Sequence, residues 1–121
     1  MTKNTKKILV ADDNEGIVAS LTMVLQYGGY EVTSLTSGEA VQKIKVPFPD
    51  LILLDIWMNG VSGLDVCKDL KTRDDTKHIP IVMFSAHPDA SSSVREAGAN
   101  DFIEKPYTMD DMLAVVKKNL N

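Results

Sequence analysis

Five short, strand-like runs alternate with segments of helical character along this chain of 121 residues. Continuous apolar runs of this kind are typical of parallel strands that are buried on both faces. Strict alternation of strand and helix implies right-handed crossovers, with helices on both faces of the sheet. The sequence therefore predicts a doubly wound α/β fold with strand order 2-1-3-4-5, the commonest wiring for five parallel strands. The expected strands are Lys6–Ala11, Tyr30–Leu35, Asp50–Asp55, Ile79–Phe84 and Asp101–Glu104.

Start and stop signals mark the expected helices. The first helix has apolar residues at helical spacing from Ile17 to Leu25 and ends at Gly28-Gly29, where a left-handed cap is free of steric cost. Three later segments have the spacing of a capping box, in which two reciprocal hydrogen bonds open a helix. We therefore expect the second, third and fifth helices to open at Thr36 with Glu39, Ser62 with Asp65, and Thr108 with Asp111.

The fourth helical segment, Asp89 to Ala97, is expected to be the weakest. Its apolar stripe consists only of Ala90, Val94 and Ala97, and the three serines before Val94 compete with helix through local hydrogen bonds. Few large apolar contacts indicate low local stability. The segment is either a short surface helix or a mobile switch element.

Composition excludes several classes of protein. The length predicts one domain over residues 1–121, with its core at about 6–120. A net charge of −4 argues against direct binding to nucleic acid. The single cysteine, Cys67, excludes an intramolecular disulfide and a cysteine metal cluster, and its place in an apolar helical stripe predicts a packed core thiol. Neither a membrane span nor a signal peptide is visible, so we expect a cytoplasmic protein that does not bind membranes.

Carboxylates follow two of the predicted strands. Asp12 and Asp13 come after the first strand and Asp55 ends the third, so the predicted order brings all three together at the carboxyl edge. At about 4 Å and an effective dielectric near 20, each pair of like charges costs roughly 4 kcal/mol. The cluster therefore needs a cation, and hard oxygen ligands favour Mg²⁺. A carboxylate beside Mg²⁺ is also a competent nucleophile toward phosphorus, which gives an acyl phosphate.

Two further polar residues are expected at the same edge. Ser85 follows the fourth strand and Lys105 the fifth, where each could hold a phosphoryl oxygen. Taken singly, each residue has a simpler interpretation: an aspartate at a strand end is usually a turn or helix cap, the serine a loop hydroxyl and the lysine a solvated surface group. Their joint spacing favours a phosphoryl-transfer site.

These residues lie in motifs that resemble the receiver domain of two-component response regulators. The resemblance spans the chain in order and is specific, and it implies the flavodoxin-like (βα)5 receiver fold. The segments that carry it are Ile8–Asn14, Leu53–Met58, Ile81–Ala86 and Gly98–Tyr107. It implies a regulatory phosphoacceptor that catalyses only its own phosphorylation and dephosphorylation.

Residue roles follow from the resemblance. Asp55 matches the phosphoacceptor, and Asp12 and Asp13 match the acidic pair that binds Mg²⁺ or Mn²⁺. The backbone carbonyl of Trp57 falls where the family supplies a further metal ligand. Further matches are Lys105 as the phosphate-contacting lysine, Ser85 and Phe102 as switch residues, and Pro106 as the site of a cis peptide bond.

The resemblance also implies the partners. The phosphoryl donor would be a sensor histidine kinase or a histidine phosphotransfer protein. The output would be a downstream protein target, or an output domain that lies outside these residues, read through a face of the fourth helix, fifth strand and fifth helix. The sequence departs from the family at Asn59, where proline is common, and Trp57 and His87 occupy positions that tune the phosphoryl lifetime.

Other readings of the same residues are weaker. A flavin-binding protein of this fold needs an anion-attracting loop after strand one, where this chain has acidic residues. A haloacid-dehalogenase-like phosphatase needs a second acid where this chain has Trp57, and His78 and His87 are poorly placed for a histidine phosphocarrier. The alternative left open is a receiver-like interaction module that does not accept phosphate.

Overall fold

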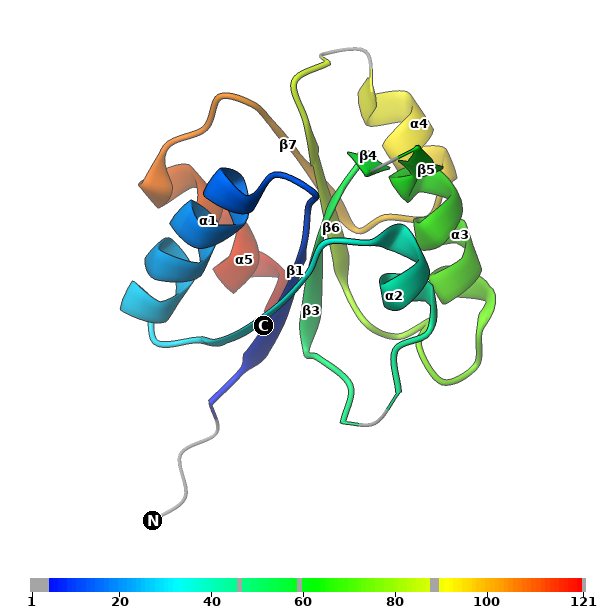
Figure 1. Ribbon diagram of the computed structural model, residues 1–121, viewed down its shortest axis with the longest axis horizontal. Coiled ribbons are helices and arrows are strands. Elements are labelled where there is room, and N and C mark those ends of the chain that lie inside the picture. The colour runs from blue at the N-terminus through cyan, green and yellow to red at the C-terminus, as the bar shows by residue number, and fades with distance from the viewer. Residues whose placement is uncertain (1–4, 46, 59, 88–89, 121) are drawn as a thin grey trace.

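A parallel five-stranded sheet forms the centre of the molecule (Figure 1). The computed structural model describes residues 5–45, 47–58, 60–87 and 90–120. The strand order β2-β1-β3-β6-β7 confirms the predicted wiring, because β6 and β7 are the fourth and fifth strands of this sheet. The strands are β1 (Lys7–Ala11), β2 (Glu31–Leu35), β3 (Leu51–Asp55), β6 (Ile81–Ser85) and β7 (Asp101–Glu104).

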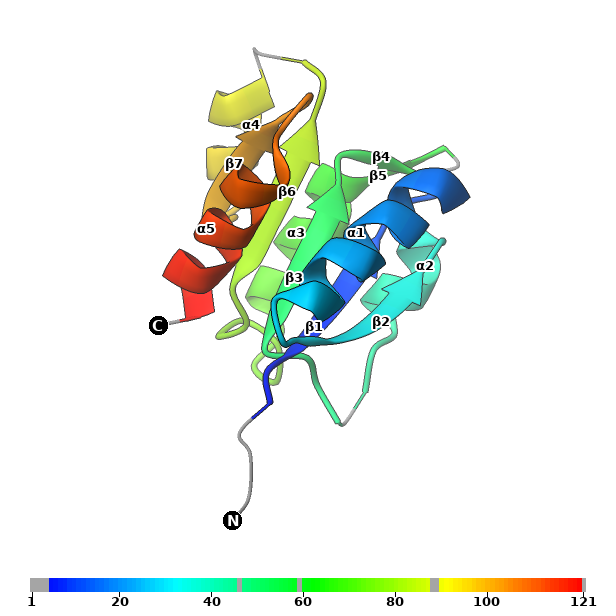
Figure 2. The same ribbon diagram turned by 90° about the vertical axis from the view of Figure 1, so that its left-hand side faces the viewer.

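Within the residues that the structure describes, five helices cover the two faces of the sheet. Helices α1 and α5 lie on one face, and α2, α3 and α4 lie on the other (Figures 1 and 2). Their bounds are α1 (Glu15–Tyr27), α2 (Gly38–Gln42), α3 (Gly63–Thr72), α4 (Ala90–Glu96) and α5 (Met109–Leu120). Within the described ranges, no helix has the length and apolar character needed to cross a membrane.

The central strand β3 divides the core into two layers. Its side chains alternate, so that Ile52 and Leu54 pack toward α2, α3 and α4, while Leu51 and Leu53 pack toward α1 and α5. All four are fully buried. Cys67 of α3 is buried in the layer that contains Ile52 and Leu54, which confirms the prediction of a packed core thiol.

A short hairpin follows β3 that the sequence did not predict. Its strands β4 (Trp57–Met58) and β5 (Val61–Ser62) pair antiparallel, and Gly60 takes a φ of 81° between them. Met58 is buried, whereas the Trp57 side chain is 59% exposed. Asn59, where the sequence departs from the family, lies outside the described residues.

Helix caps match the predictions in part. At α5, the Thr108 hydroxyl accepts from the Asp111 N–H at 3.0 Å, as predicted. At α2, the cap predicted at Thr36 is wrong: Ser37 takes this position and its hydroxyl accepts from the Ala40 N–H at 3.4 Å. Ser62 is the cap residue of α3, yet its side chain makes no capping hydrogen bond.

The remaining boundaries move by a few residues. Helix α1 begins before the apolar stripe, because the Asn14 side chain caps it by accepting from the Ile17 N–H at 3.0 Å. It ends before Gly29, whose φ is 94°. Strand β6 starts two residues later than predicted, because Ile79 donates its N–H to Thr76 in a turn and Pro80 has no N–H. The predicted start of the fourth helix, Asp89, lies outside the described residues.

Candidate functional site

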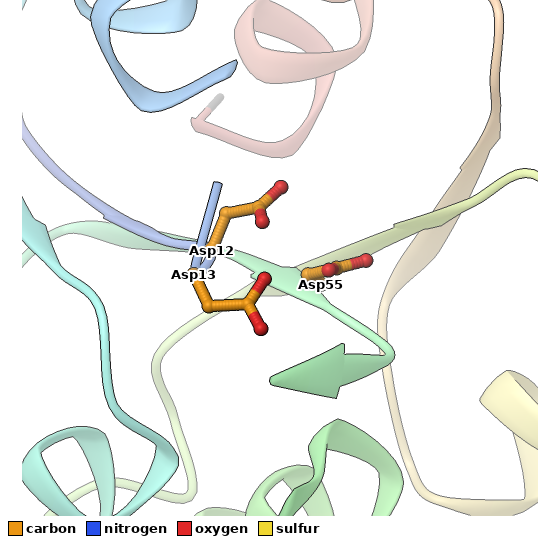
Figure 3. Close-up of side chains that lie close together, drawn as sticks. All are labelled: Asp12, Asp13 and Asp55. Carbon is orange, nitrogen blue, oxygen red and sulfur yellow. The ribbon is translucent and has the colours of Figure 1, made fainter. Parts of the chain in front are cut away.

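Three carboxylates meet at the carboxyl edge of the sheet. Asp12 and Asp13 follow β1 and Asp55 ends β3, and the two strands are paired neighbours. One carboxylate oxygen from each residue lies within 4.8 Å of the others. Figure 3 shows the three side chains gathered in this one space. The structure therefore brings together the acidic residues that the sequence singled out.

Asp12 is the most deeply buried of the three, with 1% of its surface exposed. Its Oδ1 accepts from the Asn14 N–H at 2.9 Å. Its Oδ2 is buried and has no hydrogen-bond partner among the described residues. Burial raises the pKa of Asp12, and the neighbouring Asp13 adds to this effect. A buried oxygen that no donor satisfies is costly, unless a cation completes its surroundings.

Asp55 lies beside this buried oxygen. Its Oδ1 accepts from its neighbour's backbone, the Ile56 N–H, at 3.0 Å, and the side chain is 14% exposed. Burial, followed by repulsion from Asp12, raises the pKa of Asp55 to about 6. Its carboxylate is therefore poorly solvated, yet still ionised in most molecules at neutral pH.

Lys105 supplies the nearby positive charge. Its Nζ lies 3.7 Å from Asp12 Oδ2 and 3.6 Å from Asp55 Oδ1. It also lies 4.8 Å from the centre of the Phe84 ring, which adds a cation–π contact. The peptide bond between Lys105 and Pro106 is cis, the geometry that the family resemblance implied. One ammonium leaves the three carboxylates with an excess of two negative charges, which a divalent cation would neutralise.

Ser85 is the last residue of β6 and is 4% exposed. Its hydroxyl oxygen accepts from the His87 N–H at 3.1 Å, and its carbonyl accepts from the Lys105 N–H at 2.8 Å. Because Phe84 pairs in register with Asp55, Ser85 lies one residue beyond the phosphoacceptor candidate on the neighbouring strand. Ser85 therefore lies next to the strand end that carries Asp55, and its hydroxyl contacts the backbone of the residues that follow β6.

Phe102 lies on β7, away from the carboxylates. Its ring is partly buried against the layer that contains α4. A pocket of about 300 Å³ lies between α4 and β7, and its lining includes Ser91, Val94, Arg95 and Phe102. The structure thus places this aromatic residue beside free space next to α4, the helix that the sequence predicts to be the weakest.

Two side chains that contribute to the site were missed by the sequence analysis. The Lys105 ammonium lies over the Phe84 ring, and nothing in the sequence of an apolar strand indicates this cation–π contact. Tyr107 lies close enough to the pocket that burial, followed by Asp12 and Asp55, raises the pKa of its hydroxyl. A glycine also shapes the site: Gly63 lets α3 approach β3, because a Cβ at this position would collide with the Asp55 carbonyl oxygen. Tyr107 could have been suspected from its place directly after the Lys105-Pro106 pair.

A doubly wound sheet with clustered carboxylates and a lysine at its carboxyl edge is the arrangement that the resemblance to receiver domains implied. Residues 8–117 match the response regulator receiver domain, and the chain belongs to this family. Receiver domains act in two-component systems, and phosphorylation and Mg²⁺ binding are characteristic of the family.

Relatives of known identity are response regulators. The chain is 36% identical to the phosphate regulon transcriptional regulatory protein PhoB of Rhizobium meliloti, over 94% of this chain and 52% of PhoB. It is 39% identical to the alkaline phosphatase synthesis transcriptional regulatory protein PhoP of Bacillus subtilis, over 93% of this chain and 47% of PhoP. The chain therefore spans about half the length of the curated relatives it matches.

Solved structures show the same fold. The receiver domain of NtrX from Brucella abortus superimposes with a TM-score of 0.83 at 34% identity, covering 93% of this chain and 97% of that one. The chemotaxis protein CheY4 from Vibrio cholerae gives a TM-score of 0.87 at 26% identity, covering 96% and 99%.

Proposed function

We propose that this receiver domain accepts a phosphoryl group on Asp55 from a phosphohistidine donor, in a reaction that depends on Mg²⁺. The donor would be a sensor histidine kinase or a histidine phosphotransfer protein. The observation that carries the proposal is the position of Asp55, within 4.8 Å of two further carboxylates and 3.6 Å from Lys105. Nucleophile, metal ligands and phosphate-binding cation are thus available in one pocket.

Asp12, Asp13 and Asp55 would hold the metal ion, together with the backbone carbonyl of Trp57. The donor set fits the ion, because it offers only hard oxygen ligands and includes the unsatisfied Asp12 Oδ2. Mn²⁺ prefers similar ligands and would bind there too. When bound, such a cation neutralises charge on the phosphoryl oxygens and on the carboxylates around them.

In the transfer step, a carboxylate oxygen of Asp55 attacks the phosphorus atom. A P–O bond forms as the P–N bond to the donor histidine breaks, and the imidazole leaves with its electron pair and takes up a proton. The product is an acyl phosphate. Lys105, 3.6 Å from Asp55 Oδ1, would bind one phosphoryl oxygen through a charge-assisted hydrogen bond. In hydrolysis, water attacks the same phosphorus atom, the P–O bond to Asp55 breaks, and inorganic phosphate leaves as the carboxylate is restored.

The phosphoryl group would then reach the output face through Ser85. Its hydroxyl can donate to a phosphoryl oxygen, and it already contacts the backbone of His87. Movement of this loop toward Asp55 would open space that Phe102 could occupy, and would shift the population of the face formed by α4, β7 and α5. This face would be bound by a downstream protein or by an output domain. The curated relatives are about twice as long as this chain, which leaves room in them for such a domain.

The alternative is a receiver-like interaction module that does not accept phosphate. Such a module has no need of a crowded acidic pocket, whose repulsion is a cost to the folded protein. The retained set of Asp12, Asp13, Asp55 and Lys105 therefore favours the phosphoacceptor.

Incubation with acetyl phosphate separates the two functions. In Mg²⁺, the intact mass should rise by one acid-labile phosphoryl group, and chelator should prevent the rise. Asp55→Asn should remove the labelling, whereas Asp65→Asn, an exposed carboxylate on α3, should leave it unchanged. Equal labelling of Asp55→Asn and the parent protein would contradict the proposal.

A further inference from the structure

The C-terminal end of α4 is held by a network of polar contacts centred on Lys71 of α3. The Lys71 Nζ donates to the carbonyl of Ile79 at 2.8 Å, to Asn100 Oδ1 at 2.8 Å and to the carbonyl of Lys77 at 3.4 Å. Asn100 Oδ1 also accepts from the Ile81 N–H at 3.0 Å, and the Asn100 N–H donates to the Ile81 carbonyl at 2.8 Å. The loop after α4 is therefore tied to both α3 and the start of β6.

A second set of contacts holds the residues that directly follow α4. The Cys67 thiol donates to the Ala97 carbonyl at 3.5 Å, and Ala97 is buried. Gly98 has a φ of 92°, and the Ala99 N–H returns to the Val94 carbonyl, which closes the helix with a left-handed glycine cap. A Cβ at Gly98 would meet the Lys71 side chain at 3.3 Å, so the cap is packed directly against the lysine stem.

The first residue of β7 is also held by side chains of α5. Asp101 Oδ2 accepts from Asn119 Nδ2 of α5 at 3.0 Å and lies 3.4 Å from the Lys118 Nζ. The segment from Ala97 to Asp101 is thus fixed to α3, β6 and α5 at once.

Among the residues that the structure describes, the side chains in the first half of α4 make no hydrogen bond or ion pair of this kind. Ser91, Ser92 and Ser93 are exposed, and Val94 is the only buried residue within Ala90–Glu96. A pocket of about 300 Å³ lies between α4 and β7, lined by Ser91, Val94 and Arg95 of the helix and by Ala99 to Phe102, so the helix as a whole has room to move toward β7. Of the two ends, the one nearer Ser85 and the phosphoacceptor is therefore the loose one.

We infer that α4 works as a lever whose fixed end is the Lys71–Asn100 network, with Gly98 at the pivot. The lever rests on the proposed function, because its input is the movement of the Ser85–His87 loop toward a phosphoryl group on Asp55. Lys71 and Asn100 are positioning residues in this scheme. Because these two residues hold one end of α4, movement of the other end tilts the helix and reshapes the α4–β7 face. Without this anchor the whole helix would detach, and the change at Asp55 would not reach that face.

The anchor is tested first, in metal-free protein, by amide hydrogen exchange. In Lys71→Met, the Ile81 and Asn100 amides should exchange about tenfold faster than in the parent, measured relative to amides of β3. Lys68→Met is the matched control, because this lysine lies one turn earlier on α3, is exposed and has no hydrogen bond or ion pair within the described chain. It should change these amides by less than about twofold.

Asn100→Asp provides a conservative rescue. Its carboxylate keeps an oxygen for both Lys71 and the Ile81 N–H, so the Ile81 amide should exchange at nearly the parent rate. Asn100→Leu removes the acceptor and should behave as Lys71→Met does. If Lys71→Met and Lys68→Met exchange alike at Ile81 and Asn100, the anchor is ruled out.

The lever is tested by adding beryllofluoride and Mg²⁺, a mimic of the phosphoryl group. In the parent, amides of Ser91 to Val94 should change by about fivefold or more and those of Ala97 to Asn100 by less than twofold. In Lys71→Met the response should spread to both segments. Equal responses of the two segments in the parent would overturn the lever. No response in any variant would overturn the proposed function, while the metal-free comparison would still decide the anchor.

Discussion

At the residue scale, the properties of Asp55 come from its surroundings. Desolvation and the Asp12 charge raise its pKa to about 6, while Lys105 and the Ile56 N–H oppose this rise only in part. An ionised carboxylate that is poorly solvated is well suited to attack phosphorus, since little water must be removed from it. In metal-free protein, the same features make the pocket a source of instability above pH 6.

The pH dependence of stability follows from this pKa. Protonation of Asp55 favours the folded state, because its folded pKa of about 6 lies above the unfolded value of 3.8. The stabilisation is complete below the unfolded pKa and is lost as the pH rises through 6. In chelator, lowering the pH from 7.5 to 4.5 should favour folding of the parent by about 2 kcal/mol more than it favours Asp55→Asn. Urea denaturation of both proteins at the two pH values measures this difference, and equal changes would contradict it.

Removing one carboxylate should relieve repulsion in the same pocket. Asp13→Ala takes one charge from a cluster whose oxygens lie within 4.8 Å, so metal-free protein should gain about 1 kcal/mol in stability while Mg²⁺ binding weakens. Thermal melts in chelator measure the gain. A fall of several degrees would show that Asp13 is instead part of a structural network.

At the element scale, the close contact between β3 and α3 depends on Gly63. This residue begins α3, its N–H donates to the Ile56 carbonyl, and an added Cβ would collide with the Asp55 carbonyl oxygen. The backbone of Asp55, the proposed phosphoacceptor, is therefore positioned by a glycine in the next helix.

Gly63→Ala should consequently destabilise the protein by about 3 kcal/mol and slow phosphorylation, because the β3–α3 connection must move. Gly16→Ala on α1 is the control, since its Cβ would only approach the Asn14 side chain at 3.3 Å, and it should change stability by less than about 1 kcal/mol. Urea denaturation measures the free energy of unfolding of both variants. Equal losses of stability in Gly63→Ala and Gly16→Ala would contradict the prediction.

Elements with a strong sequence pattern were predictable from the sequence, and short ones were not. The strands of the sheet were located within two residues, and the signal in β1, β3 and β6 was the continuous apolar run of a buried parallel strand. The β4–β5 hairpin has only two residues in each strand, too few for any period to appear. At α2, Thr36 and Ser37 are both good cap residues, and only the chain path selects Ser37.

Some residues of the candidate site were likewise predictable from the sequence, and others were not. Asp12, Asp13 and Asp55 were predictable because strand order alone brings strand ends together. The ring of Phe84 under Lys105 was not, since its role depends on where a flexible side chain rests. The polar network around Lys71 joins residues 29 apart in sequence and carries no local signal.

At the scale of the whole molecule, metal binding and folding should be coupled. A ligand that binds only the folded state stabilises it by about 2.7 kcal/mol at a concentration of 100 Kd. Mg²⁺ should therefore raise the melting temperature of the parent and abolish the pH-dependent difference at Asp55, while Asp13→Ala should respond much less. Calorimetry with Mg²⁺ and with chelator measures both effects, and equal shifts in parent and variant would place the metal elsewhere.

The position of the phosphoryl group tests the central claim most directly. After reaction with acetyl phosphate in Mg²⁺, tandem mass spectrometry of peptides prepared rapidly at low temperature can locate the modified side chain. The account predicts a single acid-labile modification on Asp55. Modification of His78, His87 or another carboxylate, with Asp55 unmodified, would contradict it.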